Sequence, residues 1–149
     1  MCLIRSTNMA VKFVSSLLEK NNSSVLFMLR DDKPGIADPG MWGFISGRLE
    51  KGETYKAAAC REIKEETGLI VSPHELTPFI TISRPAKVRK VFLVFGNWEM
   101  EEIIKGEEGQ KLEFIPLAKI PKLHIGLDQR YLLSLLQEKL KTTGGSHST

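Results

Sequence analysis

The stretch GRLEKGETYKAAACREIKEETGL, residues 47–69, decides how this chain folds. Its second part, residues 55–67, is dense in Ala, Glu, Lys and Arg, which favour the α-helix. Thr54 is a good N-cap, and Gly68 is a good terminator because glycine adopts the left-handed conformation at little cost. The pattern therefore predicts a helix over residues 55–67 that follows a loop.

The predicted helix has an acidic side and an apolar side. At about 100° per residue, Glu62, Glu65 and Glu66 lie within about 100° of one another. Glu62 and Glu66 form an i,i+4 pair of like charges that costs about 0.2–0.5 kcal/mol. Such a face is either solvated or a cation site, and a bound cation would turn the cost into a gain. Hard divalent ions suit carboxylates, whereas the lack of His or Cys in the cluster argues against zinc.

The spacing around this helix matches a known pattern. Gly47 is followed after five residues by Glu53, and after seven more by the run REIKEETGL, residues 61–69. This resembles the Nudix box, Gly-x5-Glu-x7-Arg-Glu-U-x-Glu-Glu-x-Gly-U with U apolar, at every fixed position. Seven fixed residues match by chance in roughly one window in 10⁸. A weaker resemblance, to the MutT-like branch, covers residues 30–123. It implies an α/β fold: an α/β/α sandwich with a mixed sheet, a central catalytic loop-helix and a C-terminal helix.

The resemblance also implies roles for the charged residues of the box. Glu53 is expected to pair with Arg61 and so to fix the loop against the helix. Glu62 and Glu66 are expected to be direct Mg²⁺ ligands, and Glu65 a ligand or a water-orienting carboxylate. Mg²⁺ is the expected cofactor, and Mn²⁺ is expected to substitute for it. The implied reaction is attack of water on a phosphorus of a diphosphate.

A further acidic segment lies outside the box. The run EEGQKLEF, residues 107–114, resembles a Glu-Gly-Gln-x-x-Glu-aromatic segment of the MutT-like branch, in which the first Glu joins the metal site. Glu108 is therefore the candidate fourth carboxylate or general base, against the alternative of a simple loop acid. Glu107 and Glu113 are the fallback candidates.

The residues before the box depart from the family pattern. Many relatives have Pro-Gly-Gly where this chain has Ile45, Ser46 and Gly47. The backbone oxygen of Ser46 is expected to be a further metal ligand, and Gly47 is expected to allow a tight turn. If the backbone of Ser46 needs a positive φ, the substitution costs on the order of 1 kcal/mol.

Residues upstream of the box suggest the substrate. The segment at residues 29–44 resembles Nudix enzymes that act on nucleoside triphosphates or nucleotide sugars. Arg30 is a candidate phosphate ligand, and Trp42 or Phe44 a candidate for stacking on a base. The alternatives are a surface arginine and core aromatics. The expected partner is a nucleotide or a nucleoside-diphosphate-linked small molecule.

Two readings of the remaining patterns stay open. The basic run at residues 84–90 is either a solvated loop or a clamp for substrate phosphates. Pro85 lies sixteen residues beyond Leu69, a spacing similar to that of the ADP-sugar branch, although a turn alone explains a proline there.

The expected function is hydrolysis of a nucleoside triphosphate, including an oxidised or non-canonical dNTP such as 8-oxo-dGTP. The alternatives are a nucleotide-sugar hydrolase of ADP-sugar or GDP-mannose type and a non-catalytic nucleotide sensor.

The rest of the chain supplies strands and a second helix. Apolar or β-branched runs predict strands at residues 10–18, 25–29, 42–46, 76–83, 88–98 and 112–116. The turn at residues 21–24 predicts a hairpin between the first two. A leucine stripe from Leu132 to Leu140 predicts a C-terminal helix, with Asp128 as its candidate cap. These elements indicate a layered α/β or α+β sandwich.

Length and composition fit one domain. The chain has 149 residues, of which 42% are hydrophobic and 26% are charged. We expect a single domain at residues 1–141 and a flexible tail at residues 142–149. The net charge of +3 is too mild to indicate a nucleic-acid partner, and the apolar runs are too short to span a membrane. Cys2 and Cys60 lack the spacing of a metal site or a disulfide scaffold, so we expect a cytoplasmic protein. We also expect a monomer or a homodimer.

Overall fold

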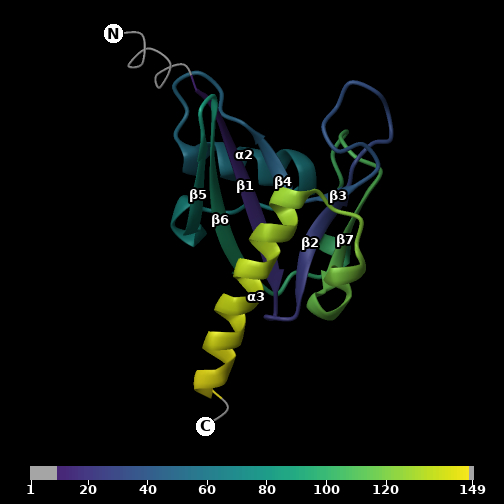
Figure 1. Ribbon diagram of the computed structural model, residues 1–149, viewed down its shortest axis with the longest axis vertical. Helices are drawn as coiled ribbons and strands as arrows, with labels where there is room; N and C mark the ends of the chain where they lie inside the picture. Colours follow the sequence, from purple (N-terminus) through teal and green to yellow (C-terminus); the bar gives the residue numbers. More distant parts are fainter. Residues whose placement is uncertain (1–9, 148–149) are drawn as a thin grey trace.

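The computed structural model describes residues 10–147, which form one mixed sheet with a helix on each face (Figure 1). The strands are β1 (Val11–Lys20), β2 (Ser24–Leu29), β3 (Trp42–Gly43), β4 (Ile45–Arg48), β5 (Thr77–Arg84), β6 (Lys87–Gly96) and β7 (Lys111–Pro116). Their order is β3-β2-β1-β6-β5, with β4 paired to β1 and β7 to β2. The β1 and β6 strands are parallel, and the other pairs are antiparallel.

The helices α2 (Tyr55–Thr67) and α3 (Leu127–His147) lie on opposite faces of this sheet (Figure 1). Ala58, Ala59 and Ile63 of α2 pack in one apolar cluster with Val14 and Leu18 of β1. The second cluster joins α3 to the other face through residues that include Leu132, Leu133, Leu136, Leu17 and Phe27. Since both faces are covered, β1 is buried without alternation from residue 14 to residue 19. The predicted α/β/α sandwich is confirmed.

The predicted hairpin is only partly correct. Asn21 and Asn22 adopt positive φ values of 53° and 56° and connect β1 to β2, as a tight hairpin requires. However, β1 pairs with β2 only at Glu19 and Lys20, whereas residues 13–16 of β1 pair with β4. The strand predicted at residues 42–46 is accordingly divided into β3 and β4, which pair with different strands. This division leaves β4 with β1 as its one partner strand among the described residues.

Three short 3₁₀ helices complete the fold: η1 (Pro73–Glu75), η2 (Met100–Glu102) and η3 (Leu117–Lys122). The C-terminal helix corrects one prediction. It begins at Leu127, so Asp128 lies inside its first turn and is not its cap. The helix extends to His147, and the flexibility of the tail at residues 142–149 stays a prediction. No helix within residues 10–147 has the length and apolar composition needed to cross a bilayer.

Candidate active site

The helix α2 has the boundaries that its sequence predicts. The side chain of Thr54 accepts a hydrogen bond from the backbone N–H of Ala57, which caps the first turn. Gly68 ends the helix with φ 77°, and its N–H donates to the carbonyl of Lys64. These contacts fix the first and last residues of the helix. The carboxylates of Glu62, Glu65 and Glu66 therefore have fixed positions along it.

The predicted pair of Glu53 and Arg61 is confirmed. The Nε and Nη2 atoms of Arg61 donate to Oε2 and Oε1 of Glu53 over 2.8 and 2.9 Å, which is a bidentate pair between loop and helix. Arg61 also donates to the carbonyl of Arg48 at 3.0 Å, and so ties the helix to the end of β4. The hydrogen bond from Arg61 lowers the pKa of Glu53 to about 2. Glu53 therefore stays ionised, and the pair positions the face of α2 that carries the candidate metal ligands.

The carboxylates of Glu62 and Glu66 lie on the inner side of the helix. Glu62 accepts a hydrogen bond of 2.7 Å from Nη1 of Arg61, while burial raises its pKa. Glu66 is only 5% exposed. Burial, and to a lesser degree the nearby charges of Glu62 and Glu108, raise the pKa of Glu66 to about 9. Glu65 is more exposed, and its carboxylate lies 3.4 Å from Nη1 of Arg61.

Glu108 lies near this cluster and belongs to the loop between η2 and β7. The N–H of Ile104 donates to the carbonyl of Thr67, and the N–H of Gly106 donates to that of Glu66, so the loop is docked on the end of α2. The carboxyl groups of Glu108 and Glu66 are close enough for a hydrogen bond between them. The structure therefore brings Glu108 to Glu62 and Glu66. Its role in binding or proton transfer stays a prediction.

Two features of this docking have no strong sequence signal. Gly106 approaches the helix so closely that a Cβ on it would overlap the carbonyl oxygen of Glu65. The ammonium group of Lys105 donates to the carbonyls of Gly106, Glu108 and Gly109 within the same loop. Gly106 and Glu65 are about 40 residues apart in the chain, so spacing alone did not indicate their contact.

The residues before the box correct two expectations. Ser46 and Gly47 lie in β4, and neither has a positive φ, so serine causes no backbone strain there. Glycine is required at position 47 by a close approach, since a Cβ would overlap the carboxyl group of Glu62. The hydroxyl of Ser46 forms a hydrogen bond of 2.8 Å with that of Ser15 on β1. The metal-ligand role of the Ser46 backbone oxygen stays a prediction.

The carboxylate cluster fits a divalent cation. Oε2 of Glu66 is buried and has no hydrogen-bond partner, which is a costly state that an oxygen-seeking cation would relieve. Among the described residues, no group of three or more His, Cys, Asp or Glu side chains is arranged to hold a metal ion by itself. One oxygen of Glu62 is instead held by Arg61. The arrangement suits a hard divalent cation that takes one or two carboxylates and keeps waters and substrate phosphates as its other ligands.

The three candidate substrate residues have different surroundings. Arg30 is half-buried, and its Nε donates to the carbonyl of Ala37 at 2.8 Å, which orders the loop at residues 31–41. Trp42 is half-buried, and Nζ of Lys111 lies 5.4 Å from its ring centroid. Phe44 is 4% exposed and packs against Phe27 with ring centroids 5.2 Å apart. The prediction that Phe44 stacks on a base is therefore wrong, because this ring is part of the core.

Gln129 of α3 lies beside the candidate substrate residue Arg30, a placement that the sequence did not indicate. Its amide oxygen is buried and has no hydrogen-bond partner. The amide lies beside Gly43, next to the aliphatic part of Arg30. An unpartnered amide is suited to the edge of a nucleobase. Gln129 follows no recognisable motif, and only the packing of α3 against β3 brings it to this place.

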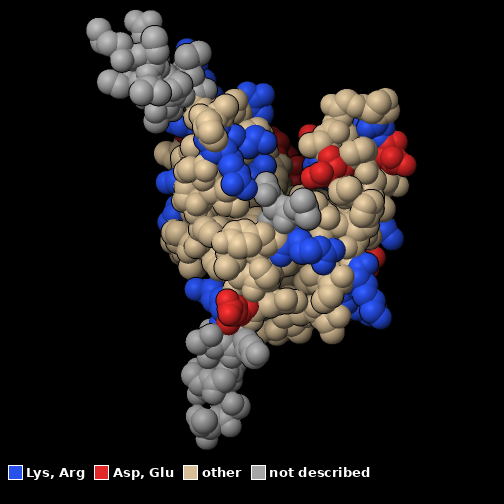
Figure 2. All heavy atoms as spheres, in the orientation of Figure 1, with Lys and Arg blue, Asp and Glu red and all other residues tan. Residues whose placement is uncertain are grey.

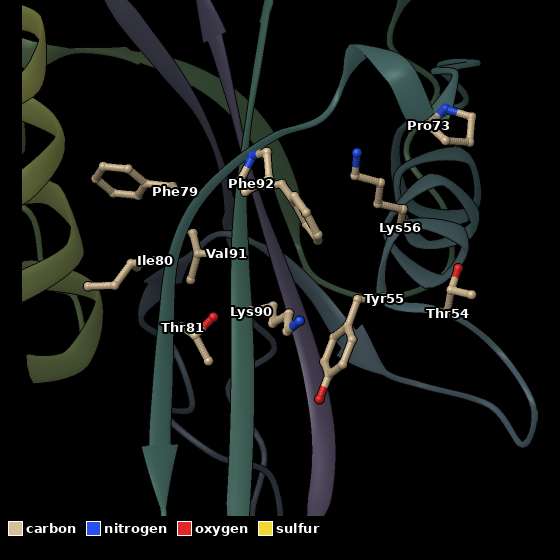
Figure 3. Close-up of a pocket in the computed structure, with 11 residues that line it drawn as sticks. Thr54, Tyr55, Lys56, Pro73, Phe79, Ile80, Thr81, Lys90, Val91 and Phe92 are labelled. Carbon is tan, nitrogen blue, oxygen red and sulfur yellow. The ribbon is translucent and has the colours of Figure 1, made fainter.

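A separate hollow lies between the start of α2 and the strands β5 and β6 (Figure 3). Its volume is about 760 Å³, and its lining includes Tyr55, Lys56, Lys90 and Phe92. None of the predicted site residues lines it. The candidate active site is therefore the carboxylate cluster and not this hollow.

Comparisons with known proteins agree with this geometry. A family model for the NUDIX domain matches residues 11–136. The chain is 32% identical over 116 residues to an "ADP-ribose pyrophosphatase" of Methanocaldococcus jannaschii, covering 74% of this chain and 64% of that protein. This chain therefore spans less than two thirds of the length of that relative.

Two solved structures have the same fold. MutT of Aliivibrio salmonicida and Vibrio cholerae matches with a TM-score of 0.74 and 21% identity, covering 87% of this chain and 98% of that one. A bifunctional NMN adenylyltransferase/ADP ribose pyrophosphatase of Francisella tularensis, complexed with AMP and an Mn ion, matches with a TM-score of 0.68 and 21% identity, covering 93% and 46%. Together with the complete box and the family match over residues 11–136, they show that this chain belongs to the NUDIX family.

Proposed function

We propose that this protein is a Mg²⁺-dependent pyrophosphohydrolase that cleaves a diphosphate linkage in a nucleoside triphosphate. Oxidised or non-canonical dNTPs such as 8-oxo-dGTP are within this class. The observation that carries the proposal is the buried, unpartnered Oε2 of Glu66 beside the carboxylates of Glu62 and Glu108. A cation at this position would relieve the repulsion among the three groups and bind substrate phosphates.

The residues of the cluster have distinct roles in this proposal. Glu62 and Glu66 hold the cation with the backbone oxygen of Ser46, while Glu65 binds or orients water. When bound, Mg²⁺ supplies charge neutralisation at the phosphoryl oxygens. Glu108 is exposed at the mouth of the cluster, where it accepts a proton from the attacking water. The pair of Glu53 and Arg61 positions these groups and does not touch the substrate.

We assign the nucleoside end of the substrate to the surroundings of Arg30, Trp42 and Gln129. Arg30 and the amide of Gln129 would bind polar groups there, and Trp42 offers a half-buried ring for stacking. A nucleotide sugar is the second candidate substrate, because the archaeal relative has the name ADP-ribose pyrophosphatase. We also propose that the protein is cytoplasmic and is a monomer or a homodimer.

A substrate panel tests this function. The purified protein is incubated with Mg²⁺ or Mn²⁺ and with dNTPs, oxidised guanine nucleotides, nucleotide sugars and dinucleotides, and product release is followed by chromatography. We expect turnover of triphosphates that stops when the metal is chelated. Absence of turnover over the whole panel with both metals would overturn the enzyme assignment in favour of a nucleotide sensor.

A further inference from the structure

The basic run at residues 84–90 is divided between the two faces of the sheet. Lys90 of β6 points to the α2 face, where its Nζ lies 4.6 Å from the ring centroid of Tyr55. Lys87 and Arg89 point to the other face, towards Phe13 of the adjacent strand β1. This follows from the two-residue period of a strand. The two interpretations of this run, a solvated loop and a clamp for substrate phosphates, therefore need not hold for all of its residues.

Three cations surround the ring of Phe13. The Nζ of Lys87 and the guanidinium carbons of Arg89 and Arg48 lie 4.9, 5.0 and 6.0 Å from its centroid. We call these three residues the basic cluster. The ring attracts each exposed cation by about 0.5–1 kcal/mol, but the like charges repel one another. Among the described side chains, no carboxylate lies within ion-pair distance of Arg48 or Lys87. An anion beside Arg48 and Lys87 would be attracted by both of these cations.

A chain of hydroxyl groups ties the basic cluster to the strand that borders the carboxylates. Nη1 of Arg89 donates to the hydroxyl of Ser15 at 2.6 Å, and this hydroxyl is hydrogen-bonded to that of Ser46. Ser46 and Arg48 lie on one face of β4, whereas Gly47 between them contacts Glu62 on the other. The basic cluster and the carboxylates therefore flank the same strand.

The molecule is hollowed on the face that Figure 2 shows. The free edge of β4 lies where β1 changes its partner from β4 to β2. In Figure 2, Lys and Arg side chains gather on one side of the hollow in the upper part of the molecule, side chains of both charge signs lie on its other side, and Asp and Glu side chains lie at depth. A substrate whose diphosphate is held at the carboxylates can thus extend past β4 towards the basic cluster.

We propose that the basic cluster of Arg48, Lys87 and Arg89 is a second anion subsite, which holds a phosphate group of the substrate other than those at the metal. This inference rests on the proposed function and narrows its substrate class. The preferred substrates have a further phosphate beyond the hydrolysed linkage, as nucleoside triphosphates do. A diphosphate that ends in a neutral sugar leaves the subsite unfilled and is a poorer substrate.

Charge-removing variants test this subsite with a control on the same strand. Arg48→Gln and Lys87→Gln each remove one exposed cation, and Lys90→Gln removes the cation that faces away. We expect the first two to lower kcat/KM for a dNTP about 10-fold, through KM and not kcat, since each removes one charge-assisted contact to the phosphate, and a tenfold change corresponds to about 1.4 kcal/mol. For ADP-ribose the change should stay within about two-fold, and Lys90→Gln should leave both substrates unaffected.

A binding measurement separates this inference from the proposed function. Inorganic triphosphate is titrated calorimetrically into the wild-type protein and the three variants without divalent metal. Weaker binding to Arg48→Gln and Lys87→Gln, with unchanged binding to Lys90→Gln, would support the subsite even if the protein hydrolyses nothing. Equal affinities in all four proteins, or equal losses for dNTP and ADP-ribose, would overturn it even if hydrolysis is observed.

Discussion

Gly47 of β4 lies directly against the carboxyl group of Glu62, so that even one added methyl group would overlap it. The strand thereby sets the position of a predicted metal ligand on the neighbouring helix. We expect Gly47→Ala to lower kcat about 10²-fold, because a carboxylate displaced by about 1 Å no longer meets its ligand geometry. Steady-state kinetics with a dNTP measures this.

Ser46→Ala is the control for this substitution. It changes the adjacent residue but keeps the backbone and removes only the hydroxyl that bonds to Ser15. We expect kcat within about three-fold of the wild-type value. Equal losses in both variants would contradict the steric account of Gly47.

Glu62→Gln and Glu66→Gln are expected to abolish most activity and to leave the fold intact. Glu62→Gln removes a charge from the cluster, whereas Glu66→Gln replaces a buried carboxyl group that its pKa of about 9 keeps protonated at neutral pH without metal. Neither substitution removes an apolar contact. Without metal, Tm should therefore be unchanged or slightly higher. Activity is followed over a range of Mg²⁺ concentrations, and thermal unfolding is followed by circular dichroism. Wild-type turnover by either variant at limiting and saturating Mg²⁺ would refute the ligand assignment.

Arg61→Lys should destabilise the loop-helix unit, because lysine cannot form the bidentate contact with Glu53. We expect a loss of about 1–3 kcal/mol in the free energy of unfolding at pH 7. The pKa of Glu53 in the folded protein is about 2, below its unfolded value, so this stability is present above about pH 4.3 and is lost towards pH 2. Urea denaturation between pH 3 and 7 measures it.

The double-mutant cycle with Glu53→Gln gives the coupling between the two side chains. Glu50→Gln serves as the comparison, since Glu50 is exposed and lies 3.7 Å from the same guanidinium. The pairing would be refuted as a source of stability if Glu53→Gln and Glu50→Gln had equal effects.

Glu108→Gln should lower kcat by roughly 10²–10⁴-fold with a much smaller change in KM, the range for general acid–base assistance. Glu107→Gln and Glu113→Gln should have smaller effects. Glu113 pairs at 3.7 Å with Lys111 on its own strand, and Glu107 is exposed. The kcat of the three variants is compared under saturating Mg²⁺. Equal losses in all three would contradict a special role for Glu108.

Glu19 should make the stability of the protein depend on pH. This residue of β1 is fully buried, and neither carboxylate oxygen has a hydrogen-bond partner. Burial raises its pKa to about 7. Because the folded pKa exceeds the unfolded one, the free energy of unfolding should fall by about 3 kcal/mol at most as the pH rises from about 4.5 to above 7.

Glu19→Gln should remove this dependence and stabilise the protein at pH 8 but not at pH 4.5. Urea denaturation at both pH values measures the difference. Glu99→Gln is the control, because Glu99 is exposed and forms only a long contact with Lys20. A greater stability of Glu19→Gln at pH 4.5 than at pH 8, relative to the wild type, would contradict the assignment.

The sequence by itself determined the loop-helix unit and its pair of opposite charges. The boundaries of α2 follow from Thr54 and Gly68, and the pairing of Glu53 with Arg61 follows from the box. These features depend on residues within about two dozen positions of one another, where spacing along the chain fixes the direction of each side chain. For the same reason, most of the predicted strands lie within one or two residues of those observed.

Only the tertiary structure decided how distant segments meet. Gly47 is required by Glu62 and not by a turn, Phe44 belongs to the core, and the basic run separates into Lys87 and Arg89 on one face and Lys90 on the other. Gln129 lies beside Gly43 and Arg30 only because α3 packs there. Each outcome depends on which strand or helix packs beside the residue, because the environment of a side chain is set by neighbours that the local pattern does not specify.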